Sequence, residues 1–115
     1  MLVSQDYPYV QVRVTVRNFR SFFRALLDTG FDGHLVLPEA LGSQLGNPDQ
    51  LIKTYLADGT ERETPIYLGD VEMAGLGIVY PVPFILLGDE CLMGQGIIRR
   101  LKVTFDHGNQ IVIEL

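Results

Sequence analysis

The tripeptide Asp28-Thr29-Gly30 contains the side chain of this sequence best placed to do chemistry. Its carboxylate directly follows the apolar residues 25–27, so we expect it to be partly removed from water, a setting that suits acid–base catalysis. The glycine frees the backbone for a tight turn that would hold the carboxylate at the end of a strand. The same tripeptide is also a serviceable turn, since Asp bonds to the backbone that follows it and Gly accepts a positive φ. Taken alone, the motif leaves the catalytic and the structural interpretation open.

Three other side chains could act as ligands or nucleophiles, but their surroundings argue against such roles. His34 has no second His, Cys or carboxylate at a metal-ligand spacing nearby, and His107 falls in a turn. We therefore expect no metal site and no cofactor. Cys91 follows two carboxylates and has no histidine near it in the sequence, so a buried apolar thiol is expected rather than a nucleophile.

Length, composition and charge limit the class of protein. The 115 residues, 47% hydrophobic and 20% charged, are expected to form one globular domain spanning 1–115. The net charge of −5 argues against binding to nucleic acid or anionic lipid, which are themselves negatively charged. No apolar segment reaches the roughly 18 residues that a membrane helix requires, and the start lacks signal-peptide features. With a single cysteine, which fits a reducing compartment, we expect a cytoplasmic protein with no nucleic-acid or membrane partner.

A β-hairpin is predicted to precede Asp28 and to hold it at the end of its second strand. Apolar and polar residues alternate over 9–17, which is typical of a half-buried strand. The pattern breaks at 17–20 and resumes over 21–27, which indicates a turn and a second strand ending at Asp28. The apolar positions of the first strand are Val10, Val12, Val14 and Val16.

The rest of the chain continues as short strands separated by turn signals. We expect strands at 34–37, 51–57, 60–64, 66–73, 78–87, 102–105 and 111–115, and short helices at 38–45 and 97–101. Pro81 and Pro83 lack backbone donors, which indicates an edge strand or a strand that is unpaired along that side. This succession predicts an all-β fold, a closed or folded-over barrel with one or two short helices.

Asp58-Gly59 is the strongest short hairpin signal in the chain. The strand that follows it, at 60–64, is polar, so the hairpin is expected to project from the body. Such a hairpin is either a plain surface loop or a mobile lid.

With these elements in order, the chain resembles a retroviral-type (retropepsin-like) aspartic protease. The resemblance rests on the predicted hairpin, on Asp-Thr-Gly within 25–31, and on the apolar strand at 35–37. A second signature, two apolar residues and a glycine before a short helix, is matched by 92–94. The version of the motif with Phe31 is similar to the small prokaryotic branch of this protease clan, clan AA. The resemblance covers nearly the whole chain in the family's order.

The resemblance implies a role for each motif residue. Asp28 would be catalytic, Thr29 would lock two active-site loops together across a dyad, and Gly30 would contact the substrate backbone. The substrate-binding residues of the loop and the flap would be Phe31, Ala57, Asp58 and Gly59. Two departures stand out: Gly96 occupies a position where many members carry Asp or Asn, and Asp58 places a charge on the flap tip.

Aspartic proteolysis requires two carboxylates that share one proton, and this chain has a single Asp-Thr-Gly. Asp32 and Asp89 lack the turn context of a second member. We therefore expect a homodimer in which Asp28 of each subunit meets at the twofold axis. The apolar ends, 1–3 and 111–115, would be interface strands as in the viral dimers. Alternatively, 111–115 completes the core of each monomer.

The function expected from these observations is that of an aspartic endopeptidase acting on extended peptides held under two flaps. The main alternative is a catalytically inactive peptide-binding or assembly module that keeps the protease fold. A third interpretation is a structural barrel whose Asp-Thr-Gly is accidental.

Overall fold

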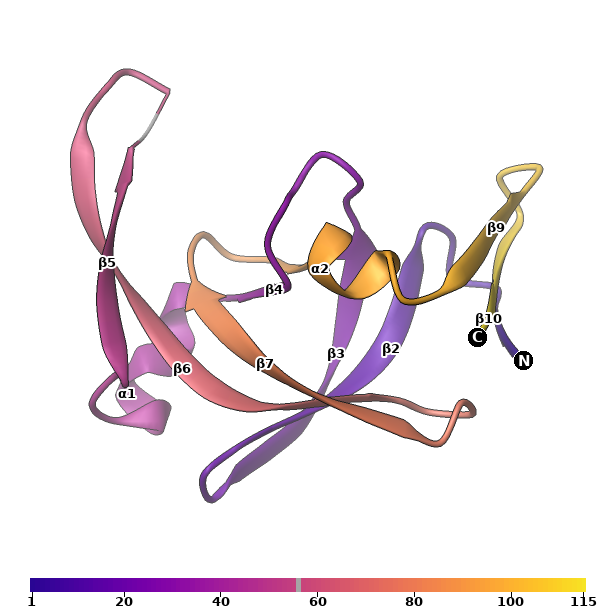
Figure 1. Cartoon of the computed structure of the whole chain (residues 1–115), viewed down its shortest axis with the longest axis horizontal. Helices are drawn as coiled ribbons and strands as arrows, with labels where there is room; N and C mark the ends of the chain where they lie inside the picture. The colour runs from indigo at the N-terminus through magenta and orange to yellow at the C-terminus, as the bar shows by residue number, and fades with distance from the viewer. Residues whose placement is uncertain (56) are drawn as a thin grey trace.

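The computed structural model describes residues 1–55 and 57–115. Most of them lie in strands that run back and forth around one core (Figure 1). The strands are β1 (Leu2–Ser4), β2 (Tyr9–Val16), β3 (Phe19–Leu27), β4 (Leu35–Leu37), β5 (Gln50–Tyr55), β6 (Glu61–Met73), β7 (Ile78–Leu86), β8 (Cys91–Met93), β9 (Lys102–Asp106) and β10 (Gln110–Glu114). The short helical elements are η1 (Glu39–Leu41), α1 (Gly42–Leu45) and α2 (Gln95–Ile98). Within the described residues, no helix has the length and apolar character needed to cross a bilayer.

The main sheet closes on itself. Its strands run in the order β2-β3-β8-β4-β7-β6-β5, and β2 also pairs with β6. This second pairing joins the two ends of the run β2 to β6 into a barrel and leaves β5 outside the ring. The prediction of an all-β closed barrel with short helices is confirmed.

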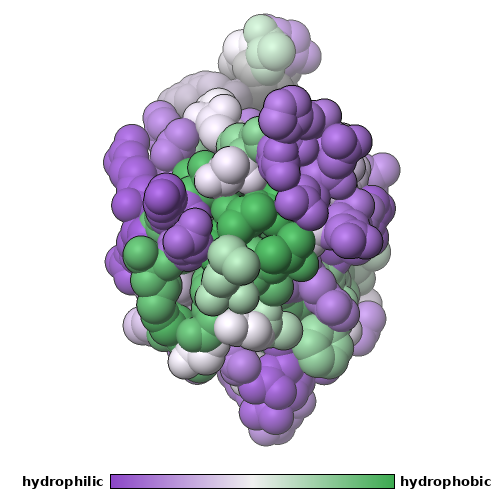
Figure 2. Space-filling view, turned by 90° about the vertical axis from the view of Figure 1, so that its right-hand side faces the viewer, coloured by the Kyte–Doolittle hydropathy of each residue, from purple (hydrophilic) through white to green (hydrophobic). Residues whose placement is uncertain are grey.

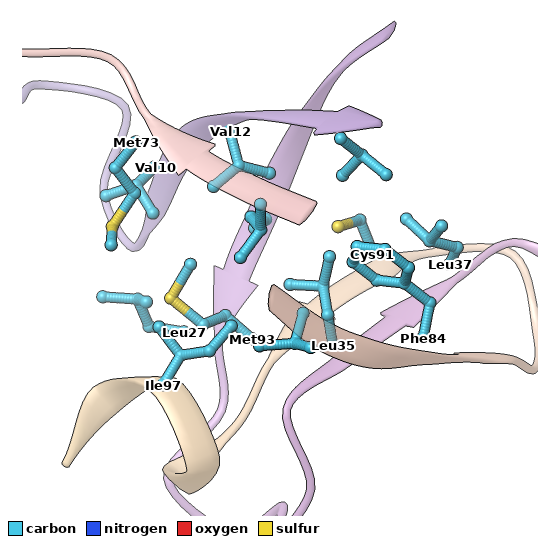
Figure 3. Packing of buried hydrophobic residues seen from close by; sticks show 14 of the residues in the cluster. Val10, Val12, Leu27, Leu35, Leu37, Met73, Phe84, Cys91, Met93 and Ile97 are labelled. Atoms are coloured by element: carbon cyan, nitrogen blue, oxygen red, sulfur yellow. The ribbon is translucent and has the colours of Figure 1, made fainter. Parts of the chain in front are cut away.

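The hairpin that leads to Asp28 follows from the alternation of its residues. The four valines of β2 point into the barrel and are almost fully buried. Arg17 adopts a positive φ of 54°, so Arg17 and Asn18 turn the chain in two residues and β3 begins earlier than predicted. At its far end Leu27 is buried beside Met93, and Ile97 of α2 belongs to the same core (Figure 3).

One prediction about the flap strands is wrong. The segments 60–64 and 66–73, expected as separate strands, form the single strand β6. Its first part pairs with β5 and its second part pairs with β7. Pro65 does not end the strand because it lies at the changeover, just before the β7 pairing begins at Ile66. As expected, the β5–β6 hairpin projects from the barrel (Figure 1); Leu56, inside the predicted strand 51–57, lies outside the described residues.

Two further expectations concern β7 and α2. The strand β7 pairs with β6 from Ile78 to Ile85, whereas β4 pairs only with Phe84–Leu86. Pro81 and Pro83 therefore lie where one side of β7 has no β4 partner, as predicted. The second helix begins at Gln95 rather than at residue 97.

The two ends of the chain form a small sheet of their own, in the order β1-β10-β9. Ile111 and Ile113 are fully buried in the core of the barrel, as the alternative reading of 111–115 expected. Val3 pairs with Val112 on the opposite face and is 43% exposed. Figure 2 shows apolar residues gathered on the side of the molecule that carries this sheet. An interface role for that side stays a prediction.

Candidate active site

Asp28 lies immediately after β3, half-buried, at the start of the loop 28–34. Its backbone N–H donates to the carbonyl oxygen of Met93 at 2.9 Å. Its Oδ1 accepts a hydrogen bond from the N–H of Gly30 at 3.0 Å, and its carbonyl accepts one from the N–H of Phe31 at 3.2 Å. The Asp28 side chain therefore bonds the backbone that follows it, as the structural interpretation expected, and this turn fixes the carboxylate. Gly30 does not have the positive φ that this interpretation also expected.

The second signature lies directly against this loop. Strand β8 lies between β3, which enters the loop, and β4, which leaves it, so that Met93 pairs with both Leu27 and Leu35. Beyond β8, backbone amides bond the start of α2 to the loop. The N–H groups of Gly94, Gln95 and Gly96 donate to the carbonyls of His34, Phe31 and Gly33 at 2.9, 2.8 and 2.9 Å. Residues 60 to 64 positions apart along the chain are thus joined in one hydrogen-bonded unit.

Glycines allow the two segments to approach this closely. A Cβ on Gly94 would overlap the Gly33 carbonyl and lie 2.6 Å from the Phe31 carbonyl oxygen. The Phe31 ring also occupies the space where side chains at Gly33 and Gly94 would be. Phe31, expected to bind substrate, therefore packs half-buried on the glycines of its own site, and its contact with substrate stays a prediction.

Thr29 and Gly30 are both exposed in the single chain. The carbonyl oxygen of Thr29 accepts a hydrogen bond from Nε2 of Gln95 at 3.0 Å. Sequence reasoning did not identify Gln95 as part of the site. Its place directly after the glycine of the second signature was the one signal available.

The predicted flap residues Ala57, Asp58 and Gly59 are exposed at the turn of the β5–β6 hairpin, where Gly59 has a φ of +85°. The Thr60 N–H donates to Asp58 Oδ1 at 2.8 Å. Hydrogen bonds from the Thr60 side chain and then from its backbone hold the pKa of Asp58 below its ordinary value. Asp58 therefore carries a negative charge even in mild acid. The flap tip and the loop 28–34 lie on the same side of the barrel (Figure 1).

Two solved structures resemble this chain over most of its length. A crystal structure of a retropepsin-like aspartic protease from Rickettsia conorii matches with a TM-score of 0.68 at 18% identity, covering 97% of this chain and 88% of that one. The solution structure of the Simian Foamy Virus (mac) protease matches with a TM-score of 0.57 at 15% identity, covering 79% of this chain and 91% of that one. The chain has a retropepsin-like fold. No protein-family model and no curated protein sequence matches it.

Residue 96 is a glycine, and the ring of His34 from the loop packs directly against it. A Cβ on Gly96 would lie 2.6 Å from Cδ2 of His34 and 2.8 Å from two further atoms of that ring. The imidazole thus fills the space that an Asp or Asn side chain would need. Gly96, which departs from the family pattern, thus leaves the room that the His34 ring occupies.

This pairing predicts a non-additive effect on stability. Gly96→Asn should lower the free energy of unfolding by about 1–3 kcal/mol, because its side chain overlaps the His34 ring. In the double variant with His34→Ala the ring is gone, so most of that loss should be recovered. Urea denaturation of the two single variants and the double variant measures the coupling, expected at roughly 0.5–3 kcal/mol. Additive losses would show that the two side chains do not compete for one space.

Cys91 was expected to be a buried thiol, and the histidines were expected to bind no metal. Cys91 is buried, and this burial raises the pKa of its thiol to about 12. The buried thiol was expected, but its pKa is raised by burial rather than by the neighbouring carboxylates. Among the described residues, no three His, Cys, Asp or Glu side chains lie together as metal ligands would.

Proposed function

We propose that the protein is an aspartic endopeptidase acting as a homodimer. The supporting observation is the Asp28 carboxylate, held by the Gly30 amide at the end of a strand in a retropepsin-like fold. One ionised Asp28 would take a proton from a water molecule. The protonated Asp28 of the partner would donate to the carbonyl oxygen of the scissile bond.

The dimer follows from the number of carboxylates. One carboxylate cannot serve as acid and base at the same moment, and the chain contains one Asp-Thr-Gly. In the single chain Thr29 and Gly30 are exposed and accessible to a second copy. Exposed apolar residues of the terminal segments would add to the interface. They are Met1, Val3, Phe105 and Leu115.

The proposed substrate is a peptide or protein segment in extended conformation, lying between the loop and the flap. Gly30 and Phe31 would contact it from the loop, and Ala57, Asp58 and Gly59 would contact it from the flap. No cofactor or metal takes part. We propose a cytoplasmic setting for one domain of residues 1–115, in which the single cysteine stays a thiol.

Diluting the protein tests whether its activity requires the dimer. Hydrolysis of a mixed peptide library at acidic pH, expressed per subunit, should fall as the protein is diluted through its dimer dissociation constant. Sedimentation velocity over the same concentrations should show the dimer fraction falling in parallel. Activity that stays constant per subunit after the dimer has dissociated would contradict a site made by two chains.

The alternative, a binding or assembly module without catalysis, draws support from the charged flap tip, where Asp58 departs from the family pattern. It predicts a dimer that binds extended peptides and leaves them intact. Binding measured by fluorescence anisotropy, followed by mass spectrometry of the recovered peptide, separates the two functions. Intact peptide after prolonged incubation at acidic pH would favour the binding module.

A further inference from the structure

Gln95 holds the loop 28–34 at two points. Its backbone N–H donates to the carbonyl oxygen of Phe31 at 2.8 Å, and its side-chain Nε2 donates to the carbonyl oxygen of Thr29 at 3.0 Å. The side chain is half-buried at the first position of α2, 66 residues along the chain from Thr29. The proposed chemistry makes no use of this amide.

The Thr29 carbonyl belongs to the same planar peptide unit as the Gly30 N–H. That N–H donates to Asp28 Oδ1 at 3.0 Å. A donor that fixes the carbonyl at one end of the plane therefore also fixes the direction of the N–H at the other end. Hydrogen bonds linked through one peptide also polarise each other, which makes the N–H a better donor.

We infer that Gln95 is a positioning residue for Asp28, acting through the Thr29–Gly30 peptide. Its catalytic consequence rests on the proposed function, but the geometric claim does not. A water molecule that replaced the lost donor in a variant would not fix the direction of the peptide plane. A neutral amide also suits this place, since it adds no charge beside a pair of carboxylates.

The test replaces the donor and keeps the length of the side chain. Gln95→Met should lower kcat about five- to tenfold, the effect of one neutral hydrogen bond, with KM changed by less than about twofold. Gln44→Met, the same change at an exposed position of α1, is the matched control and should leave both constants unchanged. Equal kcat in Gln95→Met and the parent would overturn the inference.

A second measurement does not depend on hydrolysis. In Gln95→Met, hydrogen exchange of the Gly30 amide, followed by NMR, should become about tenfold faster. The Asp28 amide, which is bonded to Met93, should exchange as in the parent. A parent protein that cleaves no peptide would refute the proposed function, and the exchange rates would still decide the role of Gln95. Unchanged exchange at Gly30 would overturn that role.

Discussion

Replacing Asp28 by asparagine should reduce kcat for peptide hydrolysis by at least about 10²-fold, the lower range for losing an acid–base group. The asparagine Oδ1 can still accept the Gly30 N–H, so the loop should keep its shape. What the amide cannot do is take a proton from water. Circular dichroism and sedimentation should therefore show the parent fold and dimer, while a peptide assay at acidic pH shows the loss. Asp89→Asn, at an exposed position after β7, is the matched control and should keep full activity.

Mixing the two proteins sharpens this test. If subunits exchange freely in an equal mixture of parent and Asp28→Asn chains, only about a quarter of the dimers contain two parent subunits. Activity should then fall to about a quarter of that of parent protein at the same total concentration. Independent active sites would instead leave about half. Hydrolysis by the pure variant at the parental rate would remove Asp28 from the mechanism altogether.

The sequence predicted the parts of the site that depend on local pattern. Alternating valines in β2 can bury one face only as a strand, and the tripeptide after β3 can form its turn with its own residues. The class of fold and the position of Asp28 followed from these local rules. The extent of β6 did not, because a strand that changes partners midway looks interrupted at Pro65 when read alone.

The supporting contacts of the loop could not be predicted for a related reason. Gly33, Gly94 and Gly96 appear in the sequence as turn formers, yet none of the three has a positive φ. Their role is to leave room for the rings of Phe31 and His34, and at Gly94 and Gly96 the ring comes from another segment of the chain. Which ring meets which glycine depends on the placement of β8 between β3 and β4, and that placement is a long-range property.

The tightest of these contacts gives the second large prediction. Gly94→Ala should destabilise the fold by about 3 kcal/mol or more, at the upper end of the range for overpacking. For a domain of this size, this corresponds to a fall in Tm on the order of 10 °C. Gly94 has a φ of −103°, which alanine adopts readily, so the cost is a steric clash rather than backbone strain. The clash involves carbonyl oxygens of the loop, which cannot move away without displacing Asp28.

Gly42→Ala provides the control that isolates this cause. Gly42 has helical φ and ψ of −54° and −37°, and the nearest atom to its added Cβ would be Leu86 Cδ1 at 3.7 Å, an ordinary contact. The same methyl group at Gly42 should leave Tm unchanged or raise it, because it should change the free energy of unfolding by between zero and about +1 kcal/mol. Scanning calorimetry of both variants, with the peptide assay below the lower Tm, separates stability from positioning. Because the folded fraction of Gly94→Ala carries a displaced loop, its kcat should remain at least about tenfold below the parent even where it is fully folded. If Gly94→Ala kept the parental Tm and kcat, there would be room for a Cβ at residue 94, and the close packing of this residue against the loop would be disproved.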